Sequence, residues 1–204
     1  VRSFFEAAWN VELDAEPGMR IPNMFDASVG GKFRGLYCQG EDVAQSDPNT
    51  QHIEEALSAL DCLVVQDIFL NETAKFAHVF FPGATFLEKD GTFTNAERRI
   101  SRVRKVTAPL GGKEDWQVTM ELANAMGYEM HYTHPSEIMD EIACLTPTFE
   151  GMSYEKLDKA GSIQWPCNQE SPSGTPIMHV NTFVRGEGYF GITEYVPTEE
   201  RANR

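Results

Sequence analysis

Polar residues able to hydrogen-bond a ligand follow two apolar runs of the sequence. The first run leads into QGEDVAQSDPN, where Gly40 lets the backbone approach a ligand closely, and Asp42 and Ser46 supply short polar side chains. The second run, CLVV, leads into Gln66 and Asp67. A carboxylate there can accept two hydrogen bonds, as from the N1–H and exocyclic amine of guanine. The alternatives are a plain acidic surface loop and, for Asp67, a helix cap.

A third polar segment, EKDGTFTNAERRISRVRK, carries five of the 17 Lys and Arg residues within eight positions. Its Lys-Asp-Gly sequence predicts a turn in which Gly91 has a positive φ. Paired arginine donors bind phosphate or pyrophosphate. On composition alone, a solvated edge strand whose charges prevent aggregation explains the arginines equally well.

Residues that would perform a reaction are not evident. There is no G-x-G-x-x-G fingerprint, Walker lysine, nucleophile elbow or iron–sulfur spacing, and His131 and His134 flank a short loop that does not predict a metal site. The four cysteines form no C-x-x-C pair, which predicts reduced thiols, with Cys62 buried in its apolar run. We therefore expect no catalytic residue and no metal ligand in this chain.

The chain is strongly acidic, with 31 Asp and Glu against 17 Lys and Arg and a net charge of −14 over 204 residues. This balance argues against nucleic-acid binding and disfavours anionic membranes. No run of 18 apolar residues is present, and the N-terminal residues do not resemble a signal peptide. We expect a cytoplasmic protein, and the absence of an initiator Met suggests a piece of a longer polypeptide.

The elements that must position the polar loops alternate between strand and helix patterns. KFRGLYCQG, DCLVVQDIF and HVFFPG read as strands, the last stopped by Pro82. Between them, TQHIEEALSAL has an amphipathic helix period, and NETAKFA reads as a short helix capped by Asn71. This order predicts an α/β fold with a doubly wound, mostly parallel sheet and helices on both faces. Ligands of such sheets bind at the carboxyl ends of the strands, where all three polar loops would lie.

The remaining sequence predicts less regular structure. Residues 14–32 read as an extended loop. KEDWQVTMELANAMGY predicts a helix ended by Gly127, HPSEIMDEIACL one capped by Ser136, and SYEKLDKAG one ended by Gly161. From Ile163 onward the chain is rich in Pro, Gly, Ser and Asn, which predicts an irregular and extended C-terminal segment.

Several of these segments together resemble the molybdopterin oxidoreductases. The segments are GEDVAQSDPN, VVQDIFLNETAKFAHVFFPGATFLEKDGTFTNAERRI, KEDWQVTMELANAMGY and YEKLDKAGSIQWPC. More narrowly, the GED, VQDIF and IQWPC pieces are similar to the catalytic (alpha) subunit of molybdenum- or tungsten-dependent formate dehydrogenases. The resemblance extends from about Lys32 to Pro197, with His78 where the family usually has Asp.

The resemblance implies binding of bis(molybdopterin guanine dinucleotide) carrying molybdenum or tungsten. It implies that one guanine nucleotide is contacted by Gly40, Asp42, Ser46, Gln66, Asp67 and Asp115, and that Glu41, Thr73, Gly91 and Thr92 shape the surroundings. Where the family often has a hydroxyl residue after the third strand, this sequence has Gly83, so a contact there must come from the backbone. Gly91 to Asn95 would line the cofactor cleft, and the arginines after them would meet phosphates, acidic neighbouring domains or another subunit.

The resemblance also implies a division of the chain and a set of partners. Residues 1–32 would arrive from a preceding part of the subunit, 33–130 would form the guanine-dinucleotide-binding half-domain, and 131–204 would be a linker towards a C-terminal barrel. The partners would be the remainder of the same subunit and electron-transfer subunits with iron–sulfur clusters and NAD or flavin, with no nucleic acid and no membrane contact. Formate would be oxidised to CO2. The alternatives are a cofactor-free structural homologue in a respiratory complex and another molybdopterin oxidoreductase such as a nitrate reductase.

Overall fold

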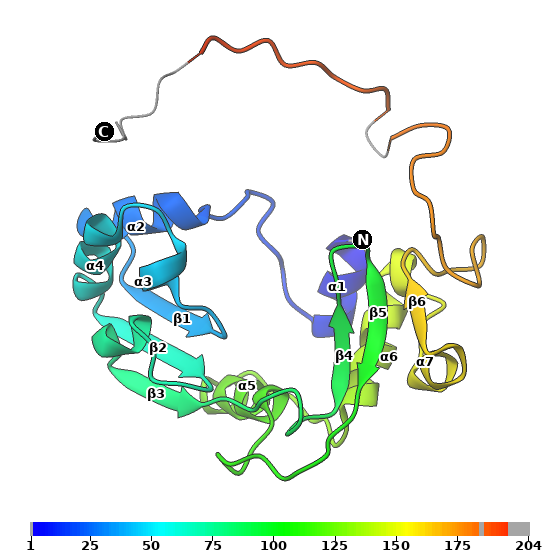
Figure 1. The fold of residues 1–204 in the computed structure, drawn as a ribbon, viewed down its shortest axis with the longest axis horizontal. Helices are drawn as coiled ribbons and strands as arrows, with labels where there is room; N and C mark the ends of the chain where they lie inside the picture. The colour runs from blue at the N-terminus through cyan, green and yellow to red at the C-terminus, as the bar shows by residue number, and fades with distance from the viewer. Residues whose placement is uncertain (1, 184–185, 196–204) are drawn as a thin grey trace, which may run out of the picture.

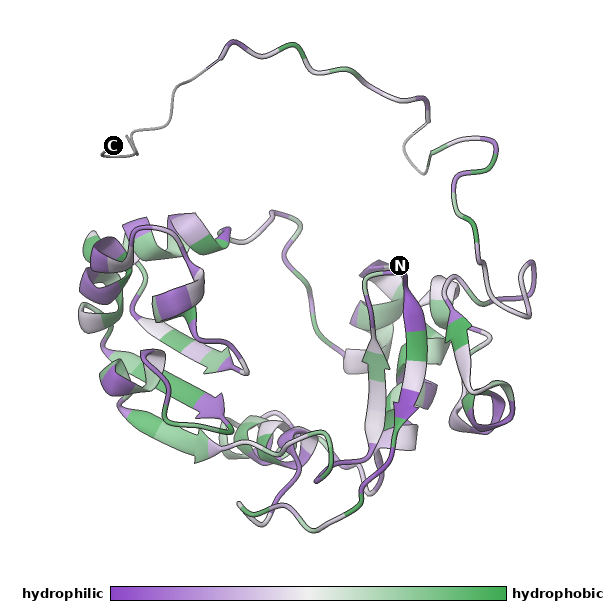
Figure 2. Cartoon of the chain, in the orientation of Figure 1, coloured by the Kyte–Doolittle hydropathy of each residue, from purple (hydrophilic) through white to green (hydrophobic). Residues whose placement is uncertain are grey.

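The first half of the chain forms a parallel sheet of three strands. The structure, a computed structural model, describes residues 2–183 and 186–195. The strands are β1 (Gly35–Gln39), β2 (Cys62–Asp67) and β3 (Val79–Pro82), which pair in that order and run parallel (Figure 1). Figure 2 shows apolar residues along β2 and β3, as expected for strands that pack against helices.

Short helices connect these strands and cover one face of the sheet. The connection from β1 to β2 contains α3 (Val43–Ser46) and α4 (Thr50–Ser58), and that from β2 to β3 contains η1 (Thr73–Phe76). The shared core is formed by alternate strand residues and the apolar faces of the helices, including Cys38, Ile53, Leu57, Leu63, Val65 and Phe80. The predicted α/β fold and the order strand, helix, strand, short helix, strand are confirmed.

A helix precedes the sheet where the sequence predicted an extended loop. α2 (Ile21–Val29) has proline in its first turn, a position where the missing N–H costs nothing. Phe25 is buried in the core, and the Ser28 hydroxyl donates a 2.6 Å hydrogen bond to the Ala56 carbonyl of α4. The prediction for residues 14–32 was wrong in this part because these tertiary contacts stabilise a helix that local composition disfavours.

The opposite face of the sheet is only partly covered. α5 (Asp115–Ala125) lies there and shares with β3 a cavity lined by Phe81, Val118 and Leu122. Val79 of β3 remains exposed, so the third strand is not fully buried as its apolar run predicted. Helices therefore lie on both faces, with the second face more open than the first.

A second, antiparallel sheet was not predicted. It consists of β4 (Gly91–Thr94), β5 (Arg99–Val103) and β6 (Ser162–Gln164), paired in that order. The hairpin turn lies between β4 and β5, where Arg98 has a φ of +67°. Gly91 begins β4 and does not have a positive φ, so the turn predicted at Lys-Asp-Gly was wrong.

The second sheet packs against helices from the second half of the chain. These are α6 (Pro135–Leu145), η2 (Pro147–Phe149) and α7 (Tyr154–Ala160), and their shared core contains Ile100, Met139, Leu157 and Ile163. The predicted Gly161 stop of α7 is confirmed, with a φ of +78°. At α6 the His134 ring accepts the cap hydrogen bond from the Ser136 N–H, so Ser136 is not the cap.

Figure 1 shows the two sheets on opposite sides of the molecule, with α5 between them. α1 (Arg2–Trp9) lies against α6, where the Trp9 indole donates a 2.9 Å hydrogen bond to Glu141. After β6 the chain first packs against the second sheet, where Cys167 is buried and the Thr175 carbonyl accepts a 3.0 Å hydrogen bond from Arg98. The later described residues then extend away from it without helix or strand, in agreement with the predicted irregular C-terminal segment (Figure 1). Part of the linker predicted at 131–204 lies outside the described residues.

Candidate functional site

A cleft lies at the carboxyl ends of the three parallel strands. It has a volume of about 320 Å³. The ends of β1 and β2, the loop after β3, strand β4 and the start of α5 all contribute to it. Its lining contains Gln39, Gly40, Gln66, Asp67, Ile68, Gly83, Ala84, Thr85, Phe86, Lys89, Phe93 and Asp115. Four of the predicted nucleotide contacts therefore meet here: Gly40, Gln66, Asp67 and Asp115.

Gln66 is held in one orientation by its neighbours. Its side chain is 1% exposed, its Nε2 donates a 3.0 Å hydrogen bond to Asp115 Oδ1, and its Oε1 accepts from the Tyr37 hydroxyl. Asp115 Oδ1 also accepts from the Ala84 N–H at 2.9 Å, while Asp115 Oδ2 pairs with Lys89 Nζ. The carboxylate of α5 is therefore fixed by groups from β2 and from the loop after β3.

Asp67 organises the loop that follows β2. Its Oδ1 accepts a 2.6 Å hydrogen bond from the Ile68 N–H, and its Oδ2 accepts one of 3.0 Å from Asn71 Nδ2. Asn71 Oδ1 in turn accepts from the Ala74 N–H at 2.9 Å, which confirms its predicted role at the short helix. Asp67 thus shapes the loop and still lines the cleft.

Two glycines bring the loops close together. Gly40 has a φ of +67°, a conformation that favours glycine, and its N–H donates to the Gln66 carbonyl at 2.9 Å. Gly83 donates to the Asp67 carbonyl at 2.8 Å, and a Cβ on Gly83 would stand 3.0 Å from the Asp67 carbonyl carbon. The glycine at this position is therefore explained by close packing against the backbone of Asp67.

Asp42 and Thr73 form a contact beside the cleft without lining it. Asp42 accepts hydrogen bonds from the Thr73 N–H at 2.9 Å and the Thr73 hydroxyl at 2.6 Å, and the same hydroxyl accepts from the Ala44 N–H. Burial alone would raise the pKa of Asp42, but the hydrogen bonds from Thr73, Glu72 and Gln45 together outweigh it and lower the pKa. The pair joins the loop after β1 to η1.

The remaining predicted residues do not line this cleft. Glu41 and Ser46 are exposed and do not line it. Gly91 and Thr92 line a neighbouring cleft of about 250 Å³, which shares Lys89, Phe93 and Asp115 with the first. The single cleft expected from the sequence thus corresponds to two neighbouring clefts, and the sequence did not indicate Lys89, which lies between them with Phe93 and Asp115.

The five basic residues between positions 98 and 105 all have partners within this chain. Arg102 is 7% exposed in its side chain, donates to Asp90 Oδ1 at 2.8 Å and stacks 3.6 Å above the Tyr154 ring. The other four contact acidic side chains or carbonyl groups: Arg98 with Thr175, Arg99 with Glu97, Arg104 with Asp158 and Lys105 with Glu114. The expectation that these arginines meet phosphates, acidic neighbouring domains or another subunit stays a prediction beside these contacts within the chain.

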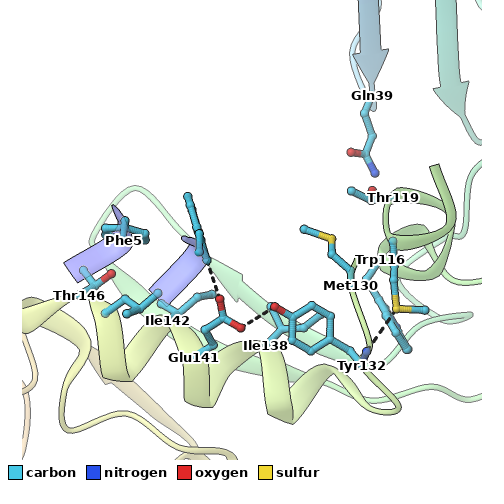
Figure 3. A pocket seen from close by; sticks show the side chains of 13 residues that line it. Phe5, Gln39, Trp116, Thr119, Met130, Tyr132, Ile138, Glu141, Ile142 and Thr146 are labelled. Atoms are coloured by element: carbon cyan, nitrogen blue, oxygen red, sulfur yellow. Dashed lines mark hydrogen bonds between the residues drawn. The ribbon is translucent and has the colours of Figure 1, made fainter. Parts of the chain in front are cut away.

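A larger apolar cavity of about 520 Å³ lies between α1, α5 and α6 (Figure 3). Glu141 is its charged residue, accepting hydrogen bonds from the Trp9 indole and, at 2.5 Å, from the Tyr132 hydroxyl. Burial, reinforced by Glu141, raises the pKa of Tyr132 to about 12. None of the predicted site residues lines this cavity. Trp116 and Met120 do line it, and their position on one apolar face of the helix at 115–125 is the sequence feature that could have indicated it.

The thiols and the ionisable groups do not form a metal cluster in the part of the chain that the structure describes. Cys38 and Cys167 are buried, whereas Cys62 and Cys144 are exposed, and all four are free. The prediction that Cys62 is buried was wrong because it is the first residue of β2, at the end of the sheet opposite the cleft. Among the described residues, no helix has the length and apolar character needed to cross a membrane.

Comparison with known proteins agrees with this geometry. The family model described as molybdopterin oxidoreductase matches residues 6–125, more than half of the chain. The chain belongs to the molybdopterin oxidoreductase family. The match includes the cleft at the ends of the parallel strands, from Gly40 to Asp115.

Curated members of the molybdopterin oxidoreductase family share high identity with this chain. The F420-dependent formate dehydrogenase subunit alpha of Methanocaldococcus jannaschii is 45% identical over 90% of this chain and 28% of its own length. The probable oxidoreductase YjgC of Bacillus subtilis is 43% identical over 92% of this chain and 19% of its own length. The chain therefore spans 19% to 28% of the length of these relatives, and the resemblance to formate dehydrogenases is confirmed.

A solved structure of lower identity agrees on the fold. Acetylene hydratase from Pelobacter acetylenicus superposes with a TM-score of 0.59 at 22% identity, over 85% of this chain and 25% of that one. At this identity the likeness concerns the fold alone.

Proposed function

We propose that this chain binds the guanine end of a molybdopterin guanine dinucleotide within the catalytic subunit of a formate dehydrogenase. The observation that carries the proposal is the meeting of Asp67 and Asp115 in one cleft with Gln66, between two loops closed by glycine. Membership of the molybdopterin oxidoreductase family supports the cofactor class. The relatives named as formate dehydrogenases support the reaction, the oxidation of formate to CO2.

The acceptors left free in the cleft fit the donor edge of guanine. A carboxylate oxygen has two lone pairs, and within residues 2–183 and 186–195 Asp67 Oδ2 and Asp115 Oδ2 each have one partner, Asn71 and Lys89. Each oxygen therefore retains acceptor capacity for the guanine N1–H or exocyclic amine. Phe86 and Phe93 of the same lining offer apolar surface to the base.

The role of these residues is to bind and orient. The bound cofactor would supply the metal centre that takes up electrons from formate, and those electrons would pass to iron–sulfur clusters in other parts of the enzyme. Asp67, Asp115 and Gln66 would fix the nucleotide end, because a correctly placed cofactor needs its distal group held. We propose that residues 33–130 do this and that 131–204 lead towards the rest of the subunit. We place the enzyme in the cytoplasm, which four free thiols support.

Calorimetric titration of the chain with nucleotides tests the guanine site. We expect GDP to bind more tightly than ADP, and IDP, which lacks the exocyclic amine, to bind about tenfold more weakly than GDP. Asp67→Asn should remove the difference between GDP and IDP. Asp47→Asn, on a residue that does not line the cleft, is the matched control. Equal affinity for GDP and ADP would rule out a guanine site.

The reaction itself is tested in a protein of the relatives' length. We expect metal analysis to find molybdenum or tungsten, and the protein to oxidise formate. Nitrate reduction without formate oxidation would favour the other molybdopterin oxidoreductases, and a folded protein without either metal would favour a structural homologue.

A further inference from the structure

Lys89 forms the boundary between the two clefts at the strand ends. The clefts have Lys89, Phe93 and Asp115 in common, and the Lys89–Asp115 ion pair is mostly buried, with 25% and 19% of the two side chains exposed. Lys89 Nζ also lies 5.8 Å from the centre of the Phe93 ring. Lys89 therefore lies between the two clefts together with Phe93 and Asp115.

The ion pair uses one of the two lone pairs of the carboxylate oxygen that a bound base would reach. Asp115 Oδ1 already accepts from Gln66 and Ala84, which uses both of its lone pairs. Oδ2 is the atom left for a ligand, and in this structure Lys89 binds it. A guanine that reaches Asp115 therefore meets the ammonium group of Lys89 at the same oxygen.

The backbone beside Lys89 is fixed, so the side chain is the part that can move. The Asp90 N–H donates to Glu114 Oε2 at 3.0 Å, and Asp90 Oδ1 accepts from Arg102 at 2.8 Å. Lys89 has a flexible four-carbon stem, with three rotatable donors on its ammonium. These hydrogen bonds of Asp90 hold the backbone next to Lys89 in place while the lysine side chain changes partners.

The charges around the clefts favour movement of the Lys89 side chain towards an entering phosphate. Among the described residues, Lys89 is the one cationic side chain that lines either cleft, while Asp67, Asp90 and Asp115 line them with negative charge. A phosphate entering the clefts is repelled by the carboxylates unless it pairs with Lys89.

We propose that Lys89 exchanges partners when a purine nucleoside diphosphate binds, leaving Asp115 to the base and pairing with the phosphates in the two neighbouring clefts. Lys89 thereby selects for a phosphorylated ligand over a bare nucleoside. The inference rests on the proposed function, because it assumes that the base binds beside Asp115.

Titrations of wild type and Lys89→Met with GDP and guanosine, at low and high salt, test this exchange. We expect Lys89→Met to weaken GDP binding about tenfold, while guanosine binding stays unchanged or tightens because Asp115 is free. The preference of the wild type for GDP over guanosine should fall with added salt. Lys89→Arg, which keeps the charge, should retain most of the preference.

Lys113→Met is the matched control, because Lys113 pairs with Glu121 and lines a different cavity. Thermal melting of each variant establishes that it is folded. The exchange would be overturned if Lys89→Met lost affinity equally for GDP and guanosine, or lost none for GDP. The guanine site would still stand in that case if the wild type preferred GDP over ADP. If wild type did not prefer GDP over ADP, the proposed function and this inference would fail together.

Discussion

Gln66 Nε2 donates a 3.0 Å hydrogen bond to Asp115 Oδ1 across 49 positions of the sequence. The bond joins the carboxyl end of β2 to the first residue of α5. Because both side chains also line the cleft, the contact that packs the helix against the sheet is the one that shapes the candidate site. Stability and ligand binding are therefore linked at this point of the fold.

Replacing Gln66 by leucine should lower the free energy of unfolding by about 1–3 kcal/mol. The leucine removes a donor to Asp115 and leaves the half-buried Tyr37 hydroxyl without its acceptor. Urea unfolding measures the change. Gln51→Leu, on an exposed residue of α4, is the control and should change stability by less than about 0.5 kcal/mol. Equal effects of the two substitutions would contradict a structural role for the Gln66 amide.

Gly83→Ala should destabilise the loop contact with Asp67. The new methyl group would lie 3.0 Å from the Asp67 carbonyl carbon and 3.3 Å from its oxygen, and overpacking of this kind costs about 1–3 kcal/mol. Gly91→Ala is the matched control, because no atom lies within 4 Å of its added methyl group. Thermal unfolding should give Gly83→Ala a lower melting temperature than Gly91→Ala. The reverse order would show that the loop after β3 is not closely packed against Asp67.

Arg102→Met should be far more destabilising than Arg104→Met, although the two arginines share Asp158 as a partner. Arg102 is enclosed by Asp90 and the Tyr154 ring, and removing one partner of a buried pair costs about 3 kcal/mol. Arg104 is 62% exposed, and a pair of that kind contributes about 0–1 kcal/mol. Denaturant titration of both variants measures the difference; similar losses would mean that the enclosure of Arg102 contributes little.

Asp42→Asn should change how stability depends on pH. The pKa of Asp42 is lowered because the hydrogen bonds from Thr73, Glu72 and Gln45 together outweigh the effect of burial. A lowered pKa contributes stability at neutral pH that is lost as pH falls below about 4, through the folded-state value. We expect the variant to be less stable than wild type at pH 7 and closer to it at pH 3.

Unfolding titrations at the two pH values measure this effect, with Ser46→Ala on the same loop as the control. Ser46 is exposed, and its substitution should leave the acid dependence unchanged. A constant difference between wild type and Asp42→Asn at both pH values would show that the ionised carboxylate is not the group that Thr73 stabilises.

The sequence alone determined the parallel half of the molecule. Residues 33–81 alternate between apolar runs and an amphipathic helix period, and these patterns act locally through burial and backbone preference. Placing Gln66 and Asp67 directly after a strand was therefore sufficient to predict that they lie at its carboxyl end. Gly161 and Asn71 were predictable for the same reason, since each acts within one turn of its helix.

Only the tertiary structure decided the partners of the polar groups. β5 pairs with β6 across some 60 positions, as Ile100 does with Ile163, and no local pattern specifies that register. From the sequence, the arginines fitted a phosphate site equally well. In the structure they contact carboxylates and carbonyls of this chain, as Arg102 does with Asp90. Lys89 became visible as the boundary between two clefts once Asp115 lay beside it. Contacts between distant segments depend on how the whole chain packs, and that information is not present in any one segment.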